Sequence, residues 1–173
     1  MASDEEWNHF IVEVQKSYHL IWPSVSLFSE ARKCYAADAY LAACVLCRAS
    51  MEALLHIAKT REPSREAVLD PSTRLTQLIE WATKEKLLEG LEKEVIGIRD
   101  IGDLAQKLDK EYKEINEDLG IRVKEENWKE LVHFYLENPA RTWVKKKEAL
   151  KTINETEKII IQVTRKRWID LVK

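Results

Sequence analysis

Apolar side chains recur every three or four residues along most of the chain, and no segment of useful length alternates between apolar and polar positions. A period of about 3.6 residues is typical of amphipathic helices, whereas alternation would indicate strands. No internal repeat, low-complexity tract or domain boundary interrupts the pattern. It predicts an all-α protein, a single-domain helical bundle of about six or seven helices over residues 1–173.

Acidic residues and prolines suggest where the first helices begin and end. A first helix is predicted to begin after Ser3 and to end before Pro23, because proline suits the first position of a new helix. A second helix then reaches about Tyr35. A third, capped near Asp38, continues to about Thr60.

The remaining elements are predicted in the same way. They are a loop over residues 61–73, a helix after Ser72 that runs through Ala82, a helix over residues 91–116, a turn at Gly120, a short helix over residues 125–137 and a long last helix from Pro139 to the C-terminus.

The chain carries 28 basic and 30 acidic residues, with only four glycines and four prolines. This composition excludes collagen, a disordered chain and a turn-rich sandwich. Residues 141–173 hold ten basic and four acidic residues, a net charge of +6, which leaves 18 basic and 26 acidic residues, or −8, for residues 1–140. Residues 145–147 and 165–167 form basic clusters that could contact phosphates, but we expect them to be a solvated helix face.

The acidic first residues lack the basic and apolar regions of a secretory signal. The longest stretch without a charged residue runs from Ser17 to Ser29, short of the ~20 apolar residues that a membrane helix needs. We therefore expect a cytoplasmic protein with no membrane contact.

The sequence contains no pattern typical of a metal or cofactor site. Cys44 and Cys47 form a C-x-x-C, but no second cysteine pair completes a zinc site, and we expect them to be buried thiols. The four histidines lack the spacing of zinc hydrolases, and the glycine-rich phosphate loops are absent. We expect no metal and no cofactor.

Between residues 39 and 58, the only charged residues are Arg48 and Glu52, which form one stripe with His56 at intervals of four residues. Such an apolar helix is expected to be central in the bundle, with Arg48 and Glu52 paired. The stripe could be a buried pair that fixes helix register, or one wall of a polar cleft. Arg99, Asp103 and Gln106 form a second stripe that could face it.

Two stretches carry a family resemblance. The first is residues 30–52, which end in Tyr-Leu-Ala-Ala-Cys-Val-Leu-Cys-Arg-Ala-Ser-Met-Glu, with an Arg-x-x-x-Glu formed by Arg48 and Glu52. The second is Ile-Arg-Asp-Ile-Gly-Asp-Leu-Ala at residues 98–105. In order and spacing they resemble the HEPN-like superfamily, the higher eukaryote and prokaryote nucleotide-binding proteins, in its uncharacterised prokaryotic branch.

The resemblance implies a HEPN-like core over residues 24–118, followed by a long basic helix over residues 140–173. Many HEPN proteins are metal-independent ribonucleases with an Arg-polar-x4–6-His motif at a dimer interface. Arg99 and Asp100 match the opening of this motif, but residues 104–107 contain no histidine, and His133 is too distant. Asp103 stands where the branch usually has Asn. No catalytic residue is therefore predicted.

Three functions remain open. The first is a non-catalytic HEPN-like module that binds RNA or a nucleotide in a polar inter-helix cleft, with Arg48, Glu52, Arg99, Asp100 and Asp103 as the ligand-binding residues. The second is a structural or partner-binding helical protein with no ligand, and the third is a metal-independent ribonuclease. The resemblance also implies a symmetric homodimer, held mainly by apolar contacts.

Overall fold

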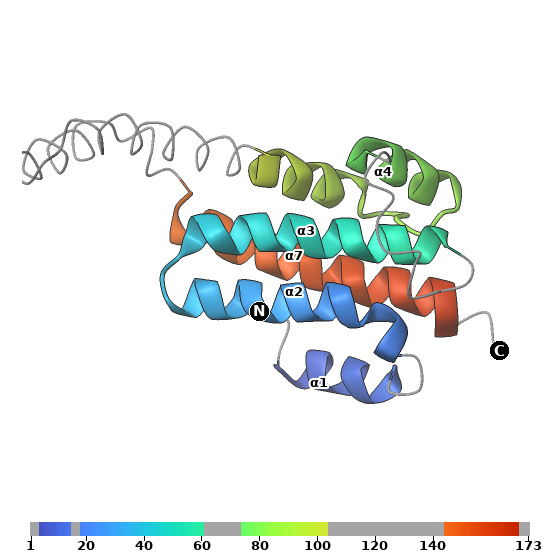
Figure 1. Ribbon diagram of the computed structural model, residues 1–173, viewed down its shortest axis with the longest axis horizontal. Helices are drawn as coiled ribbons and strands as arrows, with labels where there is room; N and C mark the ends of the chain where they lie inside the picture. Colours follow the sequence, from blue (N-terminus) through green and yellow to red (C-terminus); the bar gives the residue numbers. More distant parts are fainter. Residues whose placement is uncertain (1–3, 15–17, 61–73, 104–143, 170–173) are drawn as a thin grey trace, which may run out of the picture.

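The computed structural model describes residues 4–14, 18–60, 74–103 and 144–169. Every regular element in these ranges is a helix, which confirms the expected all-α architecture (Figure 1). Other predicted features lie outside the described residues. These are the loop over residues 61–73, the second half of the helix over residues 91–116 with Gln106, the turn at Gly120 and the helix over residues 125–137.

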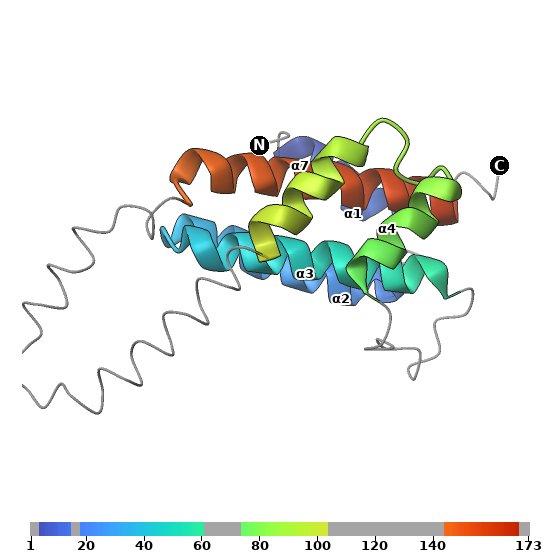
Figure 2. The same ribbon diagram turned by 90° about the horizontal axis from the view of Figure 1, so that it is seen from above.

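Helix α3 (Tyr40–Lys59) is central. Helix α2 (Tyr18–Ala36) lies along it, and helix α7 (Lys146–Thr164) packs against both. Seen from above, α2 and α3 form one layer and α7 a second (Figure 2).

Shorter helices cover the two sides of this trio. Helix α1 (Asp4–Glu13) lies below it in the view of Figure 1, and helix α4 (Leu75–Lys84) packs on α3 from above. A helix that begins at residue 92 and is described to residue 103 crosses over α7 and α3 on the same side as α4. It brings the residues 98–103 to the middle of α3.

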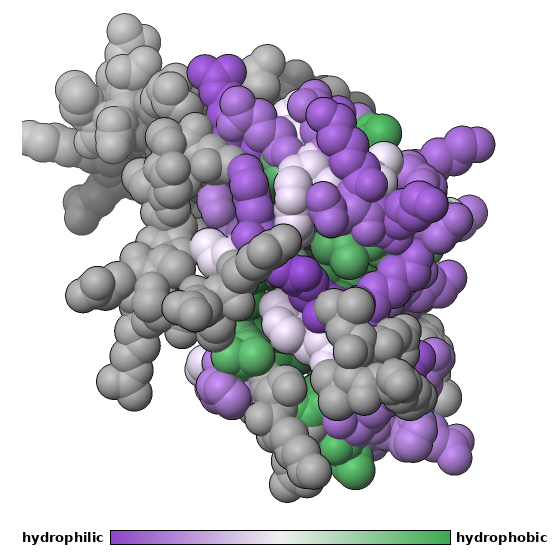
Figure 3. All heavy atoms as spheres, turned by 90° about the vertical axis from the view of Figure 1, so that its right-hand side faces the viewer, coloured by the Kyte–Doolittle hydropathy of each residue, from purple (hydrophilic) through white to green (hydrophobic). Residues whose placement is uncertain are grey.

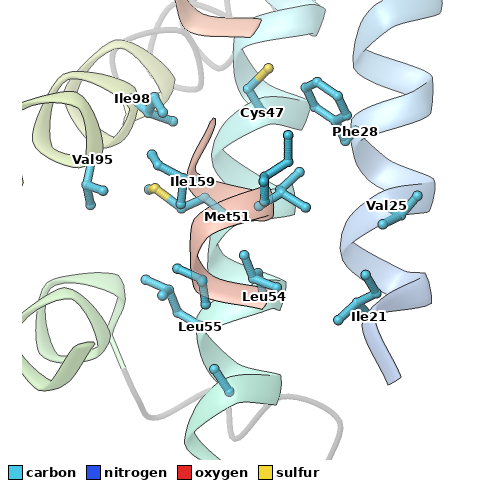
Figure 4. Close-up of a cluster of buried hydrophobic side chains, with 14 of the residues drawn as sticks. Ile21, Val25, Phe28, Cys47, Met51, Leu54, Leu55, Val95, Ile98 and Ile159 are labelled. Atoms are coloured by element: carbon cyan, nitrogen blue, oxygen red, sulfur yellow. The ribbon is translucent and has the colours of Figure 1, made fainter. Parts of the chain in front are cut away.

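The central position of α3 follows from its composition, because a helix that is apolar nearly all round must be packed on several sides. Leu54 lies on the side of α3 nearer α2, whereas Met51 extends toward Val95 and Ile98 of the crossing helix (Figure 4). Each fully buried side chain of this size contributes roughly 2 kcal/mol of apolar burial. The fully buried residues of α3 include Ala43, Cys44, Cys47, Met51, Leu54, Leu55 and Ala58.

Among the described helices, α3 alone is long and apolar enough to cross a membrane by length and composition. Half of that stretch is buried inside the bundle. The buried half of this stretch packs against neighbouring helices.

The predicted boundary at Pro23 is wrong, because Pro23 lies inside α2 and the first helix ends earlier, at Glu13. Ile21, Val25 and Phe28 continue one buried face across the proline. Pro23 itself is exposed and stands in the second turn of α2, so it removes one backbone hydrogen bond near the helix start. The burial of apolar side chains on both sides of the proline stabilises α2 by more than the lost hydrogen bond costs.

Asp38 is also not the cap of α3. Its backbone is left-handed, with φ of 59°, and the helix is preceded by Ala39, which makes no side-chain cap. The Asp38 carboxylate instead accepts a hydrogen bond from the Tyr40 hydroxyl at 2.5 Å. This bond raises the pKa of Tyr40 to about 12. Asp38 therefore forms part of the turn between α2 and α3 and does not cap α3.

The last helix begins later than predicted. Val144 and Lys145 are not helical, and α7 starts at Lys146. Val144 is buried against Cys44 and Ala149, which fixes the approach of the chain to α7. After Thr164 the helix widens into a π-helical turn, Arg165–Ile169.

Candidate functional site

The stripe on α3 meets the crossing helix through Arg48. Its Nη1 donates to Glu52 Oε2 at 2.8 Å, and its Nε donates to Asp103 Oδ1 at 2.5 Å. The guanidinium therefore bridges a carboxylate of its own helix and one that is 55 residues away in sequence. The structure confirms the expected pairing between Arg48 and Glu52, and from the second stripe Asp103 reaches Arg48.

Gly102 makes this contact possible. A Cβ atom at residue 102 would lie 2.5 Å from the Cβ of Arg48 and 2.6 Å from its Cδ, closer than side-chain carbons pack in folded proteins. Residue 102 is helical, so its conformation does not require glycine. The glycine is needed because the crossing helix lies directly against the stem of Arg48.

Arg99 and Asp100 stand one turn before Asp103 on the same helix. The Nε and Nη2 atoms of Arg99 both donate to Asp100 Oδ1, at 2.9 and 2.7 Å. Arg99 is therefore paired with its immediate neighbour, whereas Arg48, Glu52 and Asp103 are joined in one network. We call these five residues the inter-helix cluster.

The inter-helix cluster is partly open to solvent. The side chain of Arg48 is 17% exposed and that of Glu52 27%, whereas that of Asp103 is 51% exposed. The expectation of a buried pair is therefore too strong. Two guanidinium groups and three carboxylates give the cluster a formal charge of −1, so it offers hydrogen-bond donors and acceptors side by side.

Three further polar groups of α3, those of Cys44, Cys47 and His56, are buried. His56 is buried, one turn beyond Glu52. Burial raises the pKa of the Cys47 thiol to about 12 and also raises that of Cys44, in each case partly offset by a hydrogen bond to a threonine of α7. These thiols are buried as expected, and they are protonated at neutral pH, which leaves them poor nucleophiles. Within the described residues, no group of three or more His, Cys, Asp or Glu side chains could hold a metal ion.

The basic turn, Arg165 to Arg167, is not a solvated face. Arg165 binds Glu13 of α1 through two hydrogen bonds of 3.0 and 2.8 Å, and Arg167 Nε donates to the backbone oxygen of Ala58 at 2.9 Å. Successive residues of a helix point in different directions, so a run of three cations reaches three elements. The lysines 145–147, in contrast, are exposed as expected.

Lys166 is the middle residue of the basic turn. Its Nζ donates to the backbone oxygen of Lys86 at 2.8 Å and pairs with Glu89 at 3.3 Å. These partners lie about 80 residues away in sequence. No local spacing could have revealed them, since periodicity relates only residues on the same element.

Comparison of the chain with protein-family models, with curated proteins and with solved structures finds no match. The candidate site is thus defined by its own geometry. It is a partly exposed contact between α3 and the crossing helix, where Gly102 lets Arg48 reach Glu52 and Asp103 together.

Proposed function

We propose that the chain is a HEPN-like helical module without nuclease activity, which binds RNA or a nucleotide at the inter-helix cluster. The observation that supports this most is the contact of Arg48 with Gly102 and Asp103. It joins the two stretches of sequence that carry the resemblance into one partly exposed polar surface. Arg99 and Asp100 extend that surface by one helical turn.

The groups in the cluster suit the polar parts of a nucleotide. A guanidinium donates in a planar fork to phosphate oxygens and stacks on a base, whereas a carboxylate accepts hydrogen bonds from ribose hydroxyls or base amino groups. Ribonuclease chemistry would in addition need a general base that titrates near neutral pH. The five residues include no histidine, which is why the proposal is a binding module.

A second candidate is a structural or partner-binding protein, and the charge balance of the cluster favours it. Arg48 is shared between two carboxylates, and Arg99 is held by Asp100. A phosphate would have to displace at least one of these carboxylates. In this second function, the cluster fixes the position of the crossing helix and binds no ligand.

The two candidates differ in the binding of a labelled single-stranded RNA of mixed sequence, measured by fluorescence anisotropy on the full chain. A binding module is expected to lose about tenfold in affinity in Arg99→Ala, ~1.4 kcal/mol, and to bind less tightly as the salt concentration rises. Lys93→Ala, an exposed lysine earlier on the same helix, is the matched control and should bind as the parent does. No binding, or equal loss in both variants, would favour the structural candidate.

We also propose that the module is a homodimer formed across the crossing helix. Ile96 of this helix is 43% exposed and offers an apolar contact to a second copy. The bond between Arg99 and Asp100 would reduce repulsion between two copies of Arg99 near a two-fold axis. Light scattering should give a dimer mass that persists in high salt.

The variant Ile96→Asp should convert this dimer into a monomer. Val12→Asp places the same charge on an even more exposed apolar residue of α1 and should leave the dimer intact. A monomer mass for the parent chain at micromolar concentration would refute the proposed assembly.

A further inference from the structure

A cleft of about 350 Å³ lies beside the C-terminal half of α7. Its floor is one face of α7 and the π-helical turn, and its walls are α1 and the segment before the crossing helix. The volume falls within the ~300–1,000 Å³ range of small-molecule sites. The cleft is lined by Glu6, Leu91, Lys158, Ile161, Gln162, Arg165 and Lys166.

The segment of residues 85–91, which contributes Leu91 to the lining, is fixed to α7 by specific bonds. Gln162 Nε2 donates to the backbone oxygens of Leu87 and Glu89, at 3.0 and 3.1 Å. Lys166 adds its bond to the oxygen of Lys86. Left-handed backbone at Lys86 and at Gly90 lets the segment reverse direction twice in this short distance. The wall is therefore held in place by side chains of α7.

The opposite wall is held by the basic turn. Arg165 reaches Glu13 through two hydrogen bonds and so attaches α1 to the end of α7. Hydrogen bonds therefore hold both walls of the cleft in place. A site whose walls are already fixed binds with a smaller ordering cost.

The lining combines an apolar floor with a cationic rim. Leu91 and Ile161 supply the apolar part, and Lys158, Arg165 and Lys166 supply three cations against the carboxylate of Glu6. Seen from the end of the bundle, the coloured residues are mainly hydrophilic, with smaller hydrophobic areas between them (Figure 3). This lining complements a molecule that has an apolar body and an acidic group.

The cations differ in how firmly they are bound. Arg165 is held by two short bonds to Glu13, whereas the pair between Lys166 and Glu89 is longer, at 3.3 Å, and the side chain of Glu89 is 71% exposed. Lys158 is exposed at the rim. An acidic group that enters the cleft would therefore meet Lys158 and replace Glu89 on Lys166, while Arg165 continues to hold α1.

We propose that this cleft binds a small organic anion, with its apolar body on Leu91 and Ile161 and its acidic group between Lys158 and Lys166. The site is separate from the inter-helix cluster and does not depend on the function proposed for it. Carboxylate, sulfonate and phosphate groups share the chemistry that the two lysines recognise.

The probe for this proposal is 8-anilinonaphthalene-1-sulfonate, whose fluorescence rises when its aromatic rings leave water. Titration of the full chain should give one saturable site, and Lys158→Glu should weaken binding at least tenfold. Lys146→Glu is the matched control, because it makes the same change of charge on an exposed lysine of α7, ~18 Å away along the helix. It should bind the dye as the parent does.

The uncharged analogue N-phenyl-1-naphthylamine separates the acidic group from the apolar body. We expect it to bind at least tenfold more weakly than the sulfonate. Equal binding of the two dyes, or equal affinity of the parent and Lys158→Glu for the sulfonate, would overturn the proposal.

Discussion

Basic side chains join helices at two places in this molecule, and their partners differ. In the inter-helix cluster, Arg48 binds one carboxylate of its own helix and one of the crossing helix. In the basic turn, Arg167 and Lys166 donate to backbone oxygens, and Arg165 binds a carboxylate of α1. In the inter-helix cluster, side chains pair with each other on helix faces. In the basic turn, two of the three cations donate to backbone oxygens of other elements.

The difference has a physical origin. Arg48 lies in the middle of α3, where backbone oxygens are already bonded within the helix, so only side chains are available as partners. Arg167 meets the C-terminal end of α3, where the last four carbonyls have no partner inside the helix and attract a cation. The position of a cation along its neighbour therefore determines which kind of partner it finds.

The largest effect is expected when Arg48 loses both of its carboxylates. Replacing Glu52 alone should cost about 1 kcal/mol, because Asp103 remains. The double change Glu52→Ala with Asp103→Ala should cost ~3 kcal/mol, because it leaves a mostly buried guanidinium unpaired. Urea unfolding measures both values.

The pair Arg48→Met with Glu52→Leu removes the charge together with its partner and should recover much of this loss. Asp103, half exposed, then remains solvated. A double alanine variant as stable as the parent would mean that water replaces the carboxylates without cost.

Gly102→Ala should come next, with a loss of about 2 kcal/mol, since its Cβ would overlap the stem of Arg48 and move the crossing helix. Gly97→Ala is a control of opposite sign. It lies on the same helix with nothing near its Cβ, and it should stabilise the protein by ~0.5–1 kcal/mol. Thermal unfolding of the two variants tests this, and changes of equal sign would contradict the close approach.

Arg167→Ala tests the basic turn. It frees the oxygen of Ala58 at the end of α3 and should cost about 1 kcal/mol. Hydrogen exchange should show the loss at the C-terminal turn of α3. Lys147→Ala removes a charge from an exposed lysine and should change stability by less than ~0.5 kcal/mol. Equal effects of the two changes would remove the distinction between the two basic regions.

The smallest effect concerns ionisation of the thiols between α3 and α7, whose contribution to stability does not change with pH around neutrality. Burial raises the folded pKa of both thiols above the unfolded value, to about 12 for Cys47. Their contribution to stability is therefore complete below about pH 8.5 and is lost as the pH rises through the folded pKa values. At pH 8, Ellman's reagent should modify half-buried Cys34 first and reach Cys44 and Cys47 only as the protein unfolds. Cys34→Ser should remove the fast phase, and three equal rates would contradict the burial.

The sequence predicted well what depends on one element. The apolar composition of α3 predicted its central place, and a spacing of four residues predicted the pair of Arg48 and Glu52, both of which the structure confirms. It also predicted the helix after Ser72 that runs through Ala82, which is α4 in the structure.

The errors arose where a local signal competed with tertiary packing. Pro23 is a helix-start signal, yet the buried face around it carries α2 through. The basic turn resembles a solvated cluster by charge alone, but its partners lie on α1, on α3 and at residues 86–89. A glycine inside a helix suggests a less stable helix. Gly102 instead allows a close contact with Arg48, which periodicity does not reveal.

The absence of a side chain at residue 102 also decides how long the next side chain must be. With the two helices this close, the short arm of Asp103 reaches Nε, the guanidinium nitrogen nearest the stem of Arg48. A wider spacing would leave aspartate too short and would call for the extra methylene of glutamate. The close helix spacing that Gly102 permits therefore favours aspartate over glutamate at residue 103.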